Sequence, residues 1–255
     1  MMHRDVEVYV DDMIVQSRDR ADQLATLQRF FERIRQFRLR LNPKKCTFGI
    51  TFGKLLGHIV SECGIEVDPE KIRAILDMPT PRTEREIRGF LGILQYISHF
   101  IARLTNICEP IFCLLRKSQP TFWDDDCQHA FEKIKECLLS SPVLVPPTLG
   151  RPLLLYLSVL DIIVMGCMLA QLDDSGKERA IYYLSNRMLK YECRYIMIKR
   201  LCLALVWATR RLRHYVIEYS ILLVSRLDTL RYLFDMAVLT SRLMRWLLLL
   251  TKFDI

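Results

Sequence analysis

The sequence lacks a signal peptide, a zinc-binding motif and a C-x-x-C pair. Its nine cysteines are odd in number and lie mostly among apolar neighbours, which argues against a disulfide-based scaffold. Internal repeats and low-complexity tracts are missing as well. These absences favour free, reduced cysteines, and we therefore expect a cytoplasmic or nuclear protein.

One hydrophobic run could be mistaken for a membrane span. Residues 152–170 are almost wholly apolar and approach the length that a span needs. Asp161 near the middle would cost about 3 kcal/mol on insertion scales, and it divides the run into two halves of strand length. We therefore expect two buried strands of a sheet and no membrane partner.

The composition is that of a folded protein with a basic surface. Of 255 residues, 51% are hydrophobic and 26% are charged, which excludes a disordered tail or a fibre and allows one large or two modest domains. Lys and Arg number 37 against 29 Asp and Glu, which gives a net charge of +8. Arginine dominates the cations, and its forked guanidinium suits phosphate, so nucleic acid is the favoured partner.

The chain begins with a pattern that predicts a β-hairpin with two acidic residues at its tip. Residues 6–10 alternate apolar and polar side chains, Asp11 and Asp12 follow, and residues 13–15 are apolar again. Tyr9 should pack beneath the tip, with both carboxylates at the surface. An isolated hairpin is marginal in water, so we expect its partner strands to lie upstream of this sequence.

A cationic helix is expected next, over residues 20–37. Its buried face should hold Leu24, Leu27, Phe31 and Ile34. Residues 18–54 contain ten cations and three anions, which is most of the excess positive charge. A phosphate-binding surface and a merely soluble basic helix both fit this pattern. The cations concerned are Arg29, Arg33, Arg35, Arg38, Arg40, Lys44 and Lys45.

The remaining sequence divides into a helical part and a part with strands, so the predicted fold class is α+β. Residues 68–139 are helical in pattern, with a capping box at Thr83 and Glu86 and an acidic helix start at residues 124–126. Gly89 and Gly92 either permit close approach of another helix or backbone or are simply tolerated. A linker is expected at 140–147, strands at 54–60, 64–67, 152–158, 163–171, 179–184 and 220–225, and helices at 196–212, 228–235 and 239–249.

Several motifs occur in an order that resembles the Pol polyprotein of gypsy-type LTR retrotransposons, with plant Tat-type elements as the nearest likeness. They are Tyr9-Val10-Asp11-Asp12, Leu39 to Gly49, Leu55-Leu56-Gly57-His58, Pro69-x-Lys71-Ile72, Arg88-Gly89-Phe90-Leu91-Gly92 and Trp123. The resemblance extends over the whole sequence. It implies that residues 1–67 are the C-terminal part of a reverse-transcriptase palm, 68–147 the helical thumb and connection, and 148–255 an RNase H-like α/β domain truncated at its C-terminus.

The resemblance implies RNA-directed DNA synthesis, in which two magnesium ions activate the primer hydroxyl and neutralise the leaving pyrophosphate. Asp11 and Asp12 match the carboxylates that hold these ions, and Lys45, or its neighbour Lys44, matches a lysine that approaches the triphosphate. The implied partners are an RNA/DNA template-primer duplex and deoxynucleoside triphosphates. Gly57 matches the primer grip, although a simple strand bulge explains it equally well.

The RNase H-like part departs from the family at each metal-binding position. Alignment places Ser158 at the Asp of the first strand, Leu201 at the Glu of the first helix and Arg226 at the Asp of the fourth strand. None of these three side chains suits a divalent cation. Asp228 is better explained as a helix N-cap, and His214 as a structural partner at a helix end.

Three functions remain open at this point. The chain is part of an active reverse transcriptase, or a non-catalytic remnant that binds nucleic acid, or a structural protein that has recruited the fold. The aligned polymerase site needs a third carboxylate from an earlier palm strand, and the fingers that hold template and nucleotide have no counterpart in this sequence. An intact reading frame upstream would favour the enzyme.

The isolated chain is expected not to extend a primer on an RNA or DNA template with either magnesium or manganese. Two carboxylates without a third leave the metal ions under-coordinated, and nothing positions the incoming nucleotide. Primer-extension assays on the chain and on its Asp11→Asn variant test this. Extension above background that the substitution abolishes would contradict the prediction.

Overall fold

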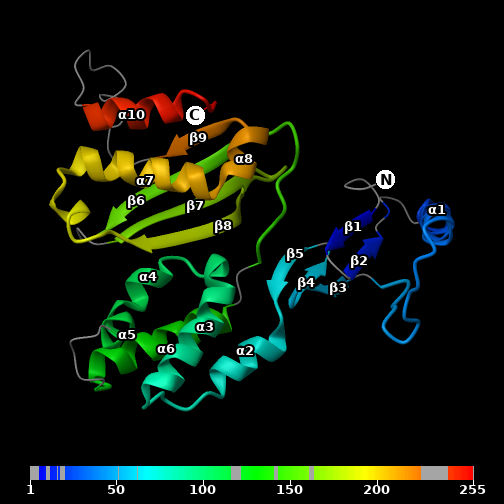
Figure 1. Ribbon diagram of the computed structural model, residues 1–255, viewed down its shortest axis with the longest axis horizontal. Coiled ribbons are helices and arrows are strands. Elements are labelled where there is room, and N and C mark those ends of the chain that lie inside the picture. The colour runs from blue at the N-terminus through cyan, green and yellow to red at the C-terminus, as the bar shows by residue number, and fades with distance from the viewer. Residues whose placement is uncertain are drawn as a thin grey trace. The chain divides into compact units, whose positions relative to one another are not determined.

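The computed structural model describes residues 6–9, 12–15, 17, 21–50, 52–61, 63–115, 122–140, 143–160, 164–224 and 241–254 of the chain (Figure 1). These residues fall into two compact units, Met1–Leu56 and Gly57–Ile255. Helices and strands occur in both units, which confirms the predicted α+β class.

The first unit begins with the predicted hairpin. Strands β1 (Val6–Tyr9) and β2 (Asp12–Val15) are antiparallel, with Val6 opposite Val15 and Tyr9 opposite Asp12. Helix α1 (Gln23–Gln36) follows, and later strand β3 (Phe52–Leu55). The hairpin prediction is therefore confirmed for the backbone. Asp11, at the tip, lies outside the described residues.

The buried face of α1 differs from the prediction. Phe30 and Ile34 are buried together with Val6 of β1, whereas Leu24 is 79% exposed. Leu24 lies at the second position of the helix, and its side chain extends beyond the small core that Phe30 and Ile34 form. The assignment of Leu24 to the buried face was wrong. The spacing of apolar residues extends one helical turn beyond the core, so Leu24 has no core to pack against.

The second unit begins with a β-hairpin, β4 (His58–Ser61) and β5 (Gly64–Val67), in which His58 pairs with Val67. The prediction of one strand over residues 54–60 was wrong. Gly57 adopts a φ of 71°, which turns the chain immediately before β4. Only glycine adopts such a conformation without strain, and the strand pattern did not register it.

Six short helices follow the hairpin and enclose a common apolar core. They are α2 (Pro69–Leu76), α3 (Glu84–Ile97), the 3-10 turn η1 (Ser98–Phe100), α4 (Leu104–Ile107), α5 (Glu109–Leu114) and α6 (Asp125–Leu139).

The starts of α3 and α6 are capped as predicted. The Thr83 hydroxyl accepts from the Glu86 backbone N–H, and the Glu86 carboxylate accepts from the Thr83 backbone N–H, so the capping box is confirmed. Asp124 accepts from the Cys127 N–H, so this acidic residue caps a helix. Phe90 of α3 packs edge-to-face on Phe131 of α6, and both rings are buried.

A four-stranded sheet in the order β8-β7-β6-β9 forms the C-terminal part. Strands β6 (Leu153–Leu160), β7 (Val164–Leu172) and β8 (Glu178–Arg187) are antiparallel neighbours, and β9 (Ile221–Val224) runs parallel to β6. The two strands expected from residues 152–170 are thereby confirmed. In the described part of the chain, no helix has the length and apolar character to cross a membrane.

Helices cover one face of this sheet. The 3-10 turn η2 (Glu192–Arg194) leads into α7 (Met197–Arg211) and α8 (Arg213–Glu218), and α10 (Ser241–Leu250) lies on the same side of the sheet as α7 (Figure 1). Leu155 of β6 and Leu205 of α7 are fully buried between sheet and helix. The helix expected at 228–235 lies outside the described residues.

The predicted linker contains a segment that is built into the fold. Leu144 is 3% exposed, and it exchanges two backbone hydrogen bonds with Ile65 of β5, at 2.7 and 3.0 Å. The next residue, Val145, donates its N–H to the carbonyl of Ala180 in β8 at 2.9 Å. Residues 143–145 therefore join the β4–β5 hairpin to the C-terminal sheet, so this part of the predicted linker is hydrogen-bonded into the fold. The proline and serine residues around this segment are typical of a linker, and they give no sign that the one leucine among them is buried.

Gly64 allows this junction to form. It has a φ of 135°, and a Cβ at this position would lie 2.3 Å from the carbonyl oxygen of Leu144. The neighbour is backbone that is itself hydrogen-bonded, so it has little freedom to move away.

Gly64→Ala is expected to lower the free energy of unfolding by about 3 kcal/mol, because it combines a strained φ with a backbone clash. Urea denaturation of the whole chain measures this. Gly92→Ala is the matched control: Gly92 is exposed within α3, and no atom lies within 4 Å of its Cβ position. The control is expected to raise the unfolding free energy by about 1 kcal/mol, since alanine favours a helix. Equal effects of the two substitutions would contradict the prediction.

Candidate nucleic-acid interface and metal positions

Of the two predicted polymerase carboxylates, Asp11 lies outside the described residues, and only the backbone of Asp12 is described. Asp12 is the first residue of β2, and its backbone pairs with Tyr9 across the hairpin. Carboxylate oxygens are the ligands that magnesium prefers, so this pair suits the ion in kind. Among the residues that the structure describes, however, no group of three His, Cys, Asp or Glu side chains could hold a metal ion.

The aligned RNase H positions lie in different surroundings. Leu201, on α7, is 2% exposed and belongs to the apolar core between helix and sheet. Ser158, on β6, is opposite Gly166 of β7. Leu155 and Leu157 of β6 point into the core with Leu201, and side chains alternate along a strand, so Ser158 faces the other side of the sheet. Arg226, Asp161 and Asp228 lie outside the described residues.

The cationic residues of the first unit are exposed along and after α1. Arg29 and Arg33 are one helical turn apart, and the Arg29 guanidinium donates to the Thr26 hydroxyl at 3.0 Å. Arg33 and Arg35 lie in the last turn, where a positive charge is favoured by the helix dipole. Arg40, Lys44 and Lys45 are exposed beyond the helix. Each of these cations is available to a polyanion.

Lys44 and Lys45 are held in a turn that Asn42 organises. The side-chain oxygen of Asn42 accepts a hydrogen bond from the Lys44 N–H at 3.1 Å, and the backbone carbonyl of Asn42 accepts one from the Lys45 N–H at 3.0 Å. This is the turn that the Asn-Pro pair predicts.

Gly57 is packed against other parts of the second unit. A Cβ here would lie 2.3 Å from Lys71 Nζ and 2.8 Å from the Tyr96 hydroxyl. Lys71 Nζ in turn lies 3.5 Å from the centre of the Tyr96 ring, a cation–π contact. The absence of a side chain at Gly57 therefore has an explanation within the protein itself.

Gly89 and Gly92 of α3 have no such explanation. Both are exposed, and no atom lies within 4 Å of either Cβ position. Arg85 and Arg88 are exposed on the same helix, and Arg88 forms an ion pair with Glu84 at 2.6 Å. The α3 surface thus combines two arginines and two glutamates with two exposed glycines that no packing among the described residues requires.

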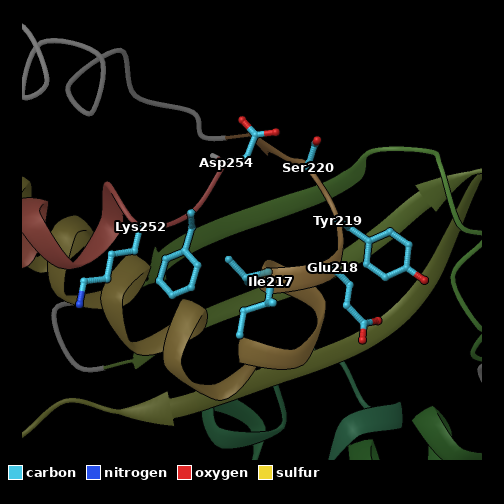
Figure 2. Close-up of a pocket in the computed structure, with 8 residues that line it drawn as sticks. Ile217, Glu218, Tyr219, Ser220, Lys252 and Asp254 are labelled. Carbon is cyan, nitrogen blue, oxygen red and sulfur yellow. The ribbon is translucent and has the colours of Figure 1, made fainter.

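A hollow of about 350 Å³ lies between residues 216–220 and residues 252–254. Figure 2 shows the carboxylates of Glu218 and Asp254 on opposite sides of this hollow, pointing away from one another. They do not converge on a point that a ligand could occupy. Asp254 has a structural contact instead, since its carbonyl accepts the Ile221 N–H at 2.8 Å.

Comparison with known proteins defines the class first. Residues 123–223 match the family of the RNase H-like domain found in reverse transcriptase. The fold agrees: the chain superposes on the foamy viral protease-reverse transcriptase dRH in complex with double-stranded DNA with a TM-score of 0.83 and 19% identity, covering 96% of this chain and 44% of that one. The same viral protein in complex with an RNA/DNA hybrid gives a TM-score of 0.78 at 19% identity, covering 96% and 34%.

The sequence relatives are more specific. The chain is 30% identical over 255 residues to the retrovirus-related Pol polyprotein from transposon 297 of Drosophila melanogaster, covering 100% of this chain and 24% of the relative. It is 33% identical over 220 residues to that from transposon opus of the same organism, covering 82% and 22%. The Tf2-3 polyprotein of Schizosaccharomyces pombe is 29% identical over 253 residues, covering 98% and 19%.

The chain is thus related to the Pol polyproteins of retrotransposons, and it contains the RNase H-like domain of their reverse transcriptases. It spans about a quarter or less of the length of these relatives.

The RNase H-like domain is expected to cleave no RNA in an RNA/DNA hybrid. Serine and leucine at the first two aligned positions cannot hold the ions that activate water. Incubating the chain with a labelled hybrid and magnesium or manganese tests this. Cleavage that is lost on changing Asp161 or Asp228 to Asn would show that the metal site lies elsewhere than the alignment places it.

Proposed function

We propose that this chain binds duplex nucleic acid through the exposed surface of α3, as part of a retrotransposon polymerase. The observation that carries the proposal is the open space at Gly89 and Gly92. Glycine inside a helix destabilises it by about 0.5–1 kcal/mol relative to alanine. Two such residues, three apart and exposed, are explained if a partner approaches the helix backbone closely.

The charge beside the glycines indicates which partner this is. Arg85 and Arg88 accompany them on α3, and the chain as a whole carries a net charge of +8. A guanidinium binds phosphate oxygens in a forked geometry. The backbone of a nucleic-acid duplex therefore fits this surface better than an apolar helix would.

Arg29, Arg33, Arg40 and Lys44 of the first unit would contribute further phosphate contacts. All four are exposed, and none is buried in the core of that unit. Because these contacts read only the backbone, binding should be independent of sequence.

In the intact polyprotein, Asp11 and Asp12 would hold magnesium at the hairpin tip, together with a further carboxylate supplied by the remainder of the palm. Lys45 would approach the triphosphate of the incoming deoxynucleotide. The similarity to Pol polyproteins supports this role, and the gypsy-type lineage remains a prediction. The boundaries of the palm, thumb and RNase H-like parts, 1–67, 68–147 and 148–255, belong to the same proposal.

The RNase H-like domain would act structurally in this arrangement. Its aligned metal positions, Ser158 and Leu201, offer no ligands, whereas its sheet and helices are well packed. We infer that the domain supports the duplex beyond the thumb. Complexes of the foamy viral protein with double-stranded DNA and with a hybrid support this inference by analogy of fold.

The double change Gly89→Ala and Gly92→Ala is expected to weaken duplex binding by about tenfold while it raises the unfolding free energy. The two methyl groups hold the partner away from the backbone, and a tenfold loss corresponds to about 1.4 kcal/mol. Fluorescence anisotropy with a labelled DNA duplex and an RNA/DNA hybrid measures the affinity. Unchanged affinity would refute the role of α3, and would leave the glycines as tolerated surface residues.

The salt dependence of the same titrations tests the phosphate contacts. If three to five phosphates are neutralised, the logarithm of the affinity should fall with that of the salt concentration at a slope of roughly −3 to −4.5. Arg33→Glu and Arg40→Glu should reduce this slope. Lys133→Glu, an exposed lysine of α6, makes the same change in net charge and is the control. A flat salt response would favour a recruited structural protein.

A further inference from the structure

Four aromatic rings from four different elements form a continuous stack in the second unit. His58 of β4 lies parallel to Tyr96 of α3, with ring centres 4.9 Å apart and an angle of 7° between the planes. The ring of His99, in η1, meets His58 edge-on at 5.4 Å. His99 also stacks on Tyr182 of β8, with centres 5.3 Å apart and an angle of 20°. The stack therefore links the hairpin, the thumb-like helices and the C-terminal sheet.

The surroundings of the two histidines are unfavourable to positive charge. The Nδ1 atom of His58 is buried and has no hydrogen-bond partner. The charged group acting on His58 is Lys71 of α2, which lies over the Tyr96 ring, and the one acting on His99 is His58 itself. Tyr182 is the titratable group on the β8 side, and Arg211 at the end of α7 acts on Tyr182. The Cys167 thiol of β7 also acts on Tyr182. The groups that act on the two imidazoles themselves are Lys71 and the His58 ring.

We propose that the His58–His99 stack is a proton-sensitive latch that holds the β4–β5 hairpin against η1 and β8. With both imidazoles neutral, the rings stack and the hairpin is docked. A proton on either imidazole places a buried cation beside Lys71 or beside the second imidazole, and the stack separates. The hairpin then keeps its connection to the sheet through the backbone hydrogen bonds between Ile65 and Leu144.

The direction of the pH dependence follows from the difference in histidine pKa between the docked and the open hairpin. Burial, with Lys71 as the second cause, lowers the pKa of His58 below its ordinary 6.5. Burial, with His58 as the second cause, lowers the pKa of His99 from 6.5 to about 4. In the open hairpin both imidazoles return to a pKa near 6.5. Above that pH the docked state is unaffected, and as the pH falls from 6.5 toward 4 the open state gains protons that the docked state does not bind.

The number of protons that opening takes up sets how steeply the opening equilibrium depends on pH. For one imidazole, the equilibrium constant for opening rises by up to tenfold for each pH unit within this window. A steeper rise is expected where both imidazoles titrate. The latch would make the position of the hairpin beside the thumb-like helices depend on pH in mildly acidic conditions. This proposal is independent of nucleic-acid binding by α3.

Histidine NMR titration of the whole unmodified chain is the first test. The imidazole signal of His99 is expected to titrate with a pKa of about 4, and that of His58 with a pKa below the ordinary 6.5. Titration of both imidazoles at 6.5 would overturn the proposal.

Amide hydrogen exchange between pH 7.5 and 5 is the second test, with rates corrected for the intrinsic effect of pH. Protection of residues 57–67 should fall as the pH is lowered, while that of α6 remains constant. The double variant His58→Phe and His99→Phe keeps aromatic rings that cannot be protonated, so its hairpin should stay protected throughout. His129→Gln is the control and should behave like the unmodified chain. Loss of protection in the double variant equal to that in the unmodified chain would also overturn the proposal.

Discussion

The backbone hydrogen bonds of Leu144 and Val145 are the contacts on which the second unit depends. They bond the segment to β5 on one side and to β8 on the other, so two strands that are distant in sequence are connected through two residues. Gly64 makes the approach possible, because a side chain there would occupy the position of the Leu144 carbonyl. The packing of the helices against the sheet has this junction at its edge. The backbone N–H of Thr105 in α4 donates to the Ser185 hydroxyl of β8 at 3.0 Å, and the hydroxyl oxygens of these two residues lie 2.9 Å apart. These contacts are a second connection to the C-terminal sheet.

A leucine at position 201 suits the fold of the C-terminal part for a physical reason. A carboxylate at the position of Leu201 would be buried, and burial of a charge without a partner is strongly unfavourable. Leucine at this position instead contributes to the core between α7 and the sheet, where burial of a leucine side chain stabilises by about 1.5–3 kcal/mol. On the proposed alignment, the domain gains stability at the position of a metal ligand, which fits the supporting role proposed for it.

The same unit contains two features whose chemistry differs. The surface of α3 is open at Gly89 and Gly92 and exposes Arg85 and Arg88 beside Glu84 and Glu86, and it is the surface proposed to contact a duplex. The ring stack of His58 and His99 is partly buried and excludes further charge. The first feature acts outward, on a ligand, and the second acts within the protein, on the position of the hairpin that precedes α2 and α3. The two proposals therefore concern separate features of the same unit.

Local sequence determined much of this protein. The alternation of residues 6–10, the capping box at Thr83 and Glu86 and the cap at Asp124 were all predictable, because each depends on neighbours within a few residues. The order of motifs along the sequence also indicates the retrotransposon family. For Gly89 and Gly92 the sequence left two alternatives, close approach of another helix or backbone and simple tolerance. The identity of a glycine does not specify which atoms lie beside it.

Tertiary structure alone decided the features that join distant segments. The burial of Leu144 within a proline-rich stretch depends on β5 and β8, and the exposure of Leu24 depends on how small the core beneath α1 is. The edge-on contact of His99 with His58 depends on a hairpin and a helical turn that only folding brings together. The local sequence pattern predicts which secondary structure a residue favours. Its burial and the proton affinity of its side chain are set by the atoms that surround it in the fold. Those atoms come from other parts of the chain, and for this reason the sequence pattern did not contain them.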